Sequence, residues 1–168
     1  MRRLTPQQYL RVMTDLFGPT VEIAGRFEPV ARQGGLLEVG TGTVGLTATG
    51  FEQFDGIARG IAGSILDAEH RDVLMPCKPA SDKAADAACA TQFFNYVGEK
   101  LYRRPLTNDE LSTQVDLATE AATSLKNFYQ GLELSFASMM VQPQFLYRQE
   151  TVVPVKSTPG RFELDAYS

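Results

Sequence analysis

Three glycines give this sequence the spacing that most resembles a ligand-binding motif. Gly40, Gly42 and Gly45 follow an apolar run, as in the turn with which methyltransferase and dinucleotide folds approach a nucleotide-like cofactor. That chemistry needs a strand, the turn, and a helix that opens at about Thr43, whereas the residues that follow are β-prone and interrupted by glycine. We therefore expect a structural glycine turn. The alternative is a transferase that binds a nucleotide-type cofactor through these three glycines.

The single histidine and the two cysteines are the other candidates for chemistry. His70, Cys77 and Cys89 do not have the number or spacing of ligands that zinc requires. Neither cysteine has the surroundings of a nucleophile, and His70 lies in a charged stretch that we expect to be exposed. Two arrangements fit the cysteines: a disulfide that joins a loop to the next helix, and a pair of buried free thiols.

Composition limits the classes of protein that fit. The 168 residues suit one domain or two small ones, and the 43% hydrophobic and 21% charged content is ordinary for a folded chain. A net charge of −4 gives no broad basic surface, so we do not expect nucleic acid as a partner. No apolar run approaches the roughly 20 residues that span a bilayer, and the N-terminus lacks the apolar segment of a signal peptide. Taken alone, these features predict a cytosolic chain or a processed piece.

The elements that must position any site are organised around a Leu-Tyr-Arg-Arg-Pro-Leu-Thr stretch. Pro105 disfavours helical geometry in the preceding residue and donates no helical hydrogen bond, so a helix should end near Arg104. Thr107 and Glu110 have the spacing of a capping box, which begins the next helix. The structural turn that we predict consists of Arg103, Arg104, Pro105, Thr107 and Glu110.

Apolar residues at helical spacing predict the remaining helices. Between the first two, the sequence is irregular and glycine-rich, with short β-prone pieces. We predict an all-α, multi-helix bundle with this irregular insertion between its first two helices. The predicted helices begin after Thr5, after Thr49 with Glu52 completing its cap, near Ser81 or Asp82, and after Thr107.

The second predicted helix contains Gly56, Gly60 and Gly63, each of which costs roughly 1 kcal/mol of helix propensity relative to alanine. Close approach of another backbone would explain them, and so would a flat cofactor lying against the helix. We expect the first explanation, because small residues at helix contacts require no ligand.

The chain divides into three segments. Residues 1–66 hold the first helix, the irregular segment and the second helix, and residues 67–150 form a helical module around the turn. Residues 151–168 are predicted to be a linker and the start of a following domain, with a new helix beginning at about residue 162.

Four motifs, in this order, resemble a known group of proteins. They are Arg-Arg-Leu-Thr at 2–5, Arg-Arg-Pro-Leu-Thr at 103–107, Pro-Gln-Phe-Leu-Tyr-Arg at 143–148 and Leu-Asp-Ala-Tyr-Ser at 164–168. The set is similar to the N-terminal half of large secreted proteins of planctomycete and proteobacterial type. Those proteins are built from tandem domains of unknown function and are associated with cytochrome c.

The resemblance implies a periplasmic or otherwise extracytoplasmic protein with a role in electron transfer. Haem c is attached in such proteins at a Cys-X-X-Cys-His motif, which this chain lacks, so the resemblance places the haem on a C-terminal or partner region. It further implies that Cys77 and Cys89 form a disulfide. It also implies that the last helices pack against a haem-bearing half or partner chain, which predicts an exposed apolar patch.

We therefore expect a non-catalytic scaffold or docking module of an exported, haem c-associated redox protein. No residue of the chain is expected to be catalytic, to bind a metal or to carry a cofactor itself, although the assembly could be an oxidoreductase. Besides the transferase, the remaining alternative is a helical protein–protein interaction module without a redox role.

Overall fold

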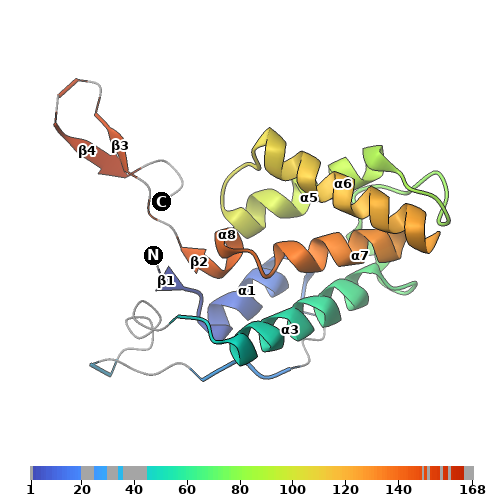
Figure 1. Ribbon diagram of the computed structural model, residues 1–168, viewed down its shortest axis with the longest axis horizontal. Helices are drawn as coiled ribbons and strands as arrows, with labels where there is room; N and C mark the ends of the chain where they lie inside the picture. Colours follow the sequence, from blue (N-terminus) through green and yellow to red (C-terminus); the bar gives the residue numbers. More distant parts are fainter. Residues whose placement is uncertain are drawn as a thin grey trace.

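The computed structural model describes residues 2–19, 25–29, 34–35, 45–148, 150, 152–155, 157–158 and 160–164. These residues form seven helices and two small antiparallel sheets, which confirms the predicted all-α class (Figure 1). The helices are α1 (Pro6–Phe17), α3 (Ala48–Leu66), α4 (Arg71–Leu74), α5 (Ala87–Tyr102), α6 (Asn108–Leu125), α7 (Phe128–Met139) and α8 (Pro143–Leu146). The paired strands are β1 (Arg2–Arg3) with β2 (Tyr147–Arg148), and β3 (Val152–Pro154) with β4 (Phe162–Leu164).

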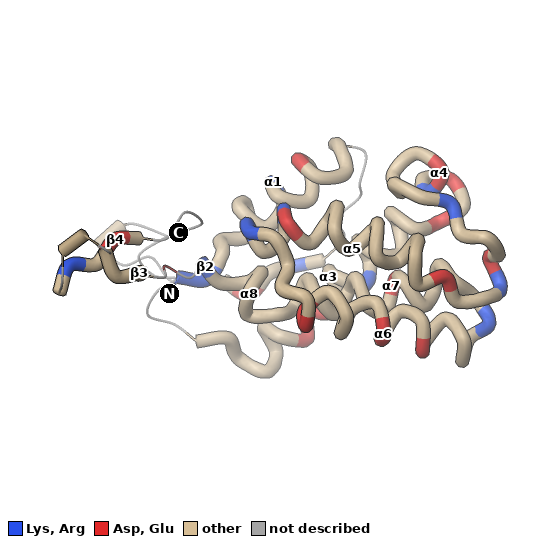
Figure 2. Tube along the Cα trace, turned by 90° about the horizontal axis from the view of Figure 1, so that it is seen from above, with Lys and Arg blue, Asp and Glu red and all other residues tan. Residues whose placement is uncertain are grey.

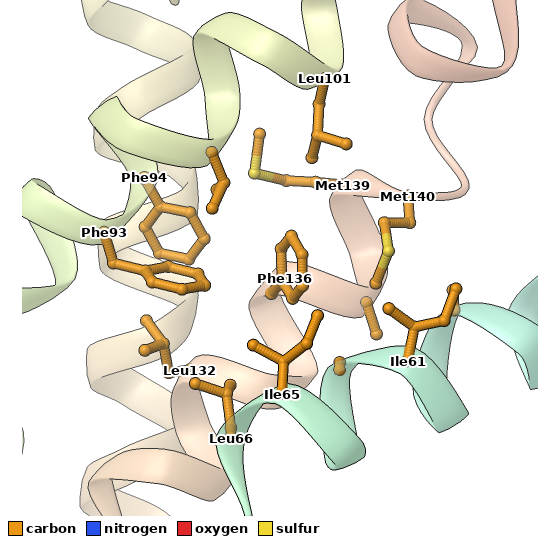
Figure 3. Close-up of a cluster of buried hydrophobic side chains, with 14 of the residues drawn as sticks. Ile61, Ile65, Leu66, Phe93, Phe94, Leu101, Leu132, Phe136, Met139 and Met140 are labelled. Carbon is orange, nitrogen blue, oxygen red and sulfur yellow. The ribbon is translucent and has the colours of Figure 1, made fainter. Parts of the chain in front are cut away.

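The hydrophobic core lies where α3, α5 and α7 face one another, with α1 and α8 packed against it. Most residues of the apolar faces predicted for the long helices are buried, whereas Phe51 at the start of α3 and Leu125 at the end of α6 are exposed. Figure 3 shows core side chains from the three central helices pointing toward one another: Ile61, Ile65, Leu66, Phe93, Phe94, Leu101, Leu132, Phe136, Met139 and Met140.

The closest helix contact lies between α6 and α7. A Cβ added at Gly131 of α7 would lie 2.5 Å from the carbonyl oxygen of Ala118 and 2.5 Å from the amide nitrogen of Ala122, both in α6. The close approach that we expected at the α3 glycines is absent at Gly56 and Gly60, where an added Cβ would meet no described atom within 4 Å. Glycine is therefore required at the α6–α7 contact, because the two backbones leave no room for a side chain.

Helix α3 begins two residues earlier than predicted. The hydroxyl of Thr47 accepts the N–H of Gly50 at 2.9 Å and caps the helix, so the expected cap at Thr49 with Glu52 is wrong. Thr47 also donates a hydrogen bond of 2.6 Å to the carboxylate of Glu28, which accepts another from buried Arg3 at 3.3 Å. Side chains far apart in the sequence thus decide which threonine caps α3.

Helix α5 begins later than the predicted start near Ser81 or Asp82. Asp86 caps the helix, and its carboxylate accepts the N–H of Cys89 at 2.9 Å and the N–H of Ala80 at 3.0 Å. The second of these bonds closes the preceding residues into a loop, so the helix starts only at Ala87.

The segment after α8 forms strands: β3 lies in the predicted linker, and β4 lies where we predicted the start of a helix. β2 pairs with β1, and β3 pairs with β4 in a hairpin with β-branched residues in β3 and Gly160 near its turn at a φ of 83°. The helix predicted from residue 162 is therefore wrong over 162–164, and residues 165–168 lie outside the described part. Figures 1 and 2 show the hairpin at one end of the molecule, away from the helices.

Candidate functional site

The turn between α5 and α6 holds the C-terminal end of the helical body in place. Arg103 ends α5 in the left-handed conformation, with φ 59°. Its guanidinium donates hydrogen bonds to the backbone carbonyls of Gln144 at 3.0 Å, Phe145 at 3.3 Å and Tyr147 at 2.8 Å. Burial, followed by the positive charge of Arg148, lowers the pKa of Arg103. One side chain thereby fixes α8 and β2, from which the hairpin continues.

The next residue of the turn anchors the start of α6. Arg104 and Glu110 form a bidentate ion pair, with the two nitrogen–oxygen contacts at 2.6 and 2.7 Å. Glu110 also accepts the N–H of Thr107 at 2.9 Å, and the Thr107 hydroxyl accepts the N–H of Glu110 at 3.2 Å, which completes a capping box. The hydrogen bond from Arg104 is the main cause that lowers the pKa of Glu110 to about 2.

We predict that Glu110 makes stability depend on pH in the acid range. Its folded pKa of about 2 lies below the ordinary glutamate value of 4.5, so its contribution to the free energy of unfolding is complete above pH 4.5 and is lost as the pH falls toward 2. Glu110→Gln should lower the free energy of unfolding at pH 7 by about 1–2 kcal/mol, because the pair is partly exposed and screened.

Urea unfolding at pH 7, 4 and 2.5 tests this prediction. The difference between wild type and Glu110→Gln should shrink toward pH 2.5. Glu120→Gln is the control, because that carboxylate is exposed on the same helix. A difference that stays constant with pH would contradict the assigned ion pair.

The β3–β4 hairpin has one apolar face that is open to solvent. Its register places Val152 opposite Leu164 and Pro154 opposite Phe162, and paired residues of antiparallel strands share a face. Val152, Phe162 and Leu164 are 59%, 62% and 57% exposed, and Pro154 is also exposed. We call Val152, Pro154, Phe162 and Leu164 the hairpin face.

A mainly apolar pocket of about 380 Å³ lies where α8 meets the start of α3. Exposed Phe51 contributes to it from α3, and Tyr147 contributes from β2. The lining consists of Leu46, Phe51, Val141, Gln142, Pro143, Leu146 and Tyr147. We call it the α8 pocket; its chemistry suits contact with apolar side chains rather than catalysis.

The structure describes only part of the glycine motif. Gly40 and Gly42 lie outside the described residues, and Gly45 is exposed in a non-helical segment. Thr43, where that alternative expects its helix to open, also lies outside the described residues; the next helix of the described part opens at Ala48, and the strands in that part pair only in antiparallel fashion. A cofactor-binding turn needs its helix directly after the glycines, so the described geometry gives the transferase alternative no support.

The structure joins Cys77 and Cys89 in a disulfide. His70 is separate from it and forms an ion pair with Asp67, in which Nδ1 lies 2.8 Å from Oδ1; this contact raises the pKa of His70. Within the described ranges, no group of His, Cys, Asp and Glu side chains suits a metal ion. Among the same residues, no helix is long and apolar enough to cross a membrane.

These observations define a mostly helical module with one disulfide, an exposed apolar hairpin, and a turn whose Arg103 donates hydrogen bonds to the backbone of α8 and β2. Residues 89–150 match the model of a family described as PSD5, a protein of unknown function (DUF1595). The matched segment runs from the disulfide in α5 to just beyond β2 and includes the whole turn. No curated protein and no solved structure matches the chain.

Sequence reasoning missed the hairpin face and the partners of Arg103. Alternating residues in two short runs on either side of Gly160 were a usable signal for a hairpin, because strands repeat every two residues. The partners of Arg103 had no local signal, since they are backbone carbonyls 41 to 44 residues away.

Proposed function

We propose that the chain is a non-catalytic docking module of an exported protein and that it binds its partner through the hairpin face. The observation that carries this proposal is the exposed apolar surface of Val152, Pro154, Phe162 and Leu164. A two-stranded hairpin is at best marginally stable in water by itself, so packing against a partner would stabilise it. Burying one large aliphatic or aromatic side chain contributes about 1.5–3 kcal/mol.

Two observations support an exported location and a redox partner. The disulfide suits an oxidising compartment outside the cytosol. The resemblance to cytochrome c-associated proteins suggests that the partner is a haem-bearing C-terminal region or chain. Haem c does not fit this chain itself, because both cysteines are in the disulfide and the single histidine precedes them.

The module would act on its partner by packing. Arg103 holds β2 rigidly against α5, and the hairpin extends beyond β2. Apolar contacts on the hairpin face would exclude water from the surface of a haem-bearing partner, and such exclusion influences a haem's reduction potential. Residues 151–168 would then lie at the junction with the partner.

Recovery of the partner tests this proposal. The chain is immobilised and exposed to an extracytoplasmic extract of its source, and the visible spectrum of the bound fraction is recorded. Wild type should retain a stoichiometric haem c band. The double variant Phe162→Ser and Leu164→Ser should retain at most about one tenth of the wild-type haem band, because each substitution removes an apolar anchor.

The matched control is Leu117→Ser with Leu125→Ser, which removes two exposed leucines from α6. It should keep the haem band, and both double variants should melt within about 3 °C of wild type, since neither touches the core. A wild-type fraction without haem would refute the redox role. Equal retention by the hairpin variant would refute docking through the hairpin.

A further inference from the structure

The disulfide differs in accessibility at its two ends. Cys89 is 3% exposed in the first turn of α5, whereas Cys77 is partly exposed in the preceding loop. Cys77, but not Cys89, lines an open pocket of about 350 Å³. A molecule in this pocket therefore meets Cys77 and not Cys89.

The charges around this pocket suit a thiolate. Lys78, next to Cys77, and Arg71 both line it, together with the carboxylate of Asp72. Arg71 is held in place by the ring of Tyr129, whose centroid lies 3.9 Å from the guanidinium carbon, and by an ion pair with Asp82 at 3.4 Å. Cations next to a sulfur favour its anionic form and attract an incoming thiolate.

We propose that the Cys77–Cys89 disulfide is a thiol–disulfide exchange site, entered through the pocket at Cys77, whose partner is a dithiol oxidoreductase. The proposal is independent of docking through the hairpin face, because the site lies on the loop before α5.

The exchange proceeds in two balanced steps. A thiolate of the partner attacks Sγ of Cys77, a partner–Cys77 mixed disulfide forms, and Cys89 leaves as a thiolate. The partner's second thiolate then attacks the partner's first sulfur, which is bonded to Cys77 in the mixed disulfide, and the thiolate of Cys77 leaves. Two electrons and two protons pass from the dithiol to the protein, so the partner becomes a disulfide and Cys77 and Cys89 become thiols.

The surroundings of Cys89 suit a leaving group. Cys89 is the third residue of α5, where the positive end of the helix dipole favours an anion, although the carboxylate of Asp86 opposes it. The loop keeps other contacts when the disulfide opens. Pro79 is buried, and the carbonyl of Asp82 accepts the N–H of Phe128 at 2.8 Å. Reduction should therefore leave the helical fold intact.

The first test identifies the sulfur that is attacked. The native chain is treated with limiting reduced glutathione, quenched, alkylated and mapped by mass spectrometry. The glutathione adduct should be on Cys77 and the alkyl group on Cys89, in at least about tenfold excess over the reverse, because Cys89 is buried. Adducts mainly on Cys89, or adducts only in denaturant, would overturn the proposal.

The second test separates attack on the native state from attack after unfolding. Glu110→Gln lowers stability far from the disulfide, so its reduction rate should stay within about twofold of wild type if the native state reacts. Lys78→Gln should slow reduction by glutathione about threefold, since it removes a cation from the lining of the pocket through which the thiolate enters. Lys83→Gln, which changes a lysine that does not line the pocket, should not. Faster reduction of Glu110→Gln, or equal slowing by both lysine variants, would contradict the assignment.

Discussion

Gly131→Ala is expected to lower the free energy of unfolding by about 3 kcal/mol or more. The new Cβ would lie 2.5 Å from backbone atoms of both Ala118 and Ala122, and backbone cannot rotate aside as a side chain can. The helices α6 and α7 must then separate, and overpacking of this kind costs about 1–3 kcal/mol. Separation also strains the buried bonds from the Ser135 hydroxyl to the backbone carbonyl of Gln114 at 2.8 Å and to its side chain at 2.9 Å, which adds about 1 kcal/mol each.

Equilibrium unfolding in urea measures this loss. Gly60→Ala is the matched control, because an added Cβ there meets no described atom within 4 Å. That control should gain about 0.5–1 kcal/mol from better helix propensity. A loss of less than 1 kcal/mol for Gly131→Ala would mean that the two backbones are farther apart than described.

Arg103→Ala is expected to lower the free energy of unfolding by about 3–4 kcal/mol. The change removes the charged donor that serves the carbonyls of Gln144, Phe145 and Tyr147, and a hydrogen bond to a charged group is worth about 1.5–3 kcal/mol. Water can reach part of the site and replace some of these hydrogen bonds, so the three contributions will not add in full. Alanine also keeps the cost of a left-handed conformation, which is about 1 kcal/mol.

Two further variants separate these causes. Arg103→Gly loses the same donor but accepts a φ of 59°, so it should be about 1 kcal/mol more stable than Arg103→Ala. Arg103→Lys keeps the charge without the planar fork and should fall between wild type and Arg103→Gly. Thermal and urea unfolding give the order. If Arg103→Lys matched wild type, the guanidinium geometry would not matter and our account of this turn would fail.

Local rules predicted the helices well where a short stretch of sequence decides the structure. The helices predicted after Thr5 and after Thr107 begin there, because a capping box needs only two side chains three residues apart. The apolar faces of the long helices follow from the same short-range periodicity, so most core residues were expected.

The prediction was wrong where contacts between residues more than one helical turn apart decide the structure. Thr47 caps α3 while bonded to Glu28, and Asp86 caps α5 while closing a loop to Ala80. The hairpin requires two short runs to pair across a turn, and residue 162 onward read as a helix when considered alone. The candidate site therefore came mainly from the structure, because its parts meet only in three dimensions.

The pairing of β1 with β2 has a mechanical consequence. Arg2 pairs with Arg148, so the two strands that bound the helical body lie side by side and run in opposite directions. Tension between residues 2 and 148 would pull the strands apart one pair at a time, which is the weak, unzipping geometry for a sheet. The β1–β2 pair should therefore separate at low force, and the helices between the two strands bear no load until it has separated.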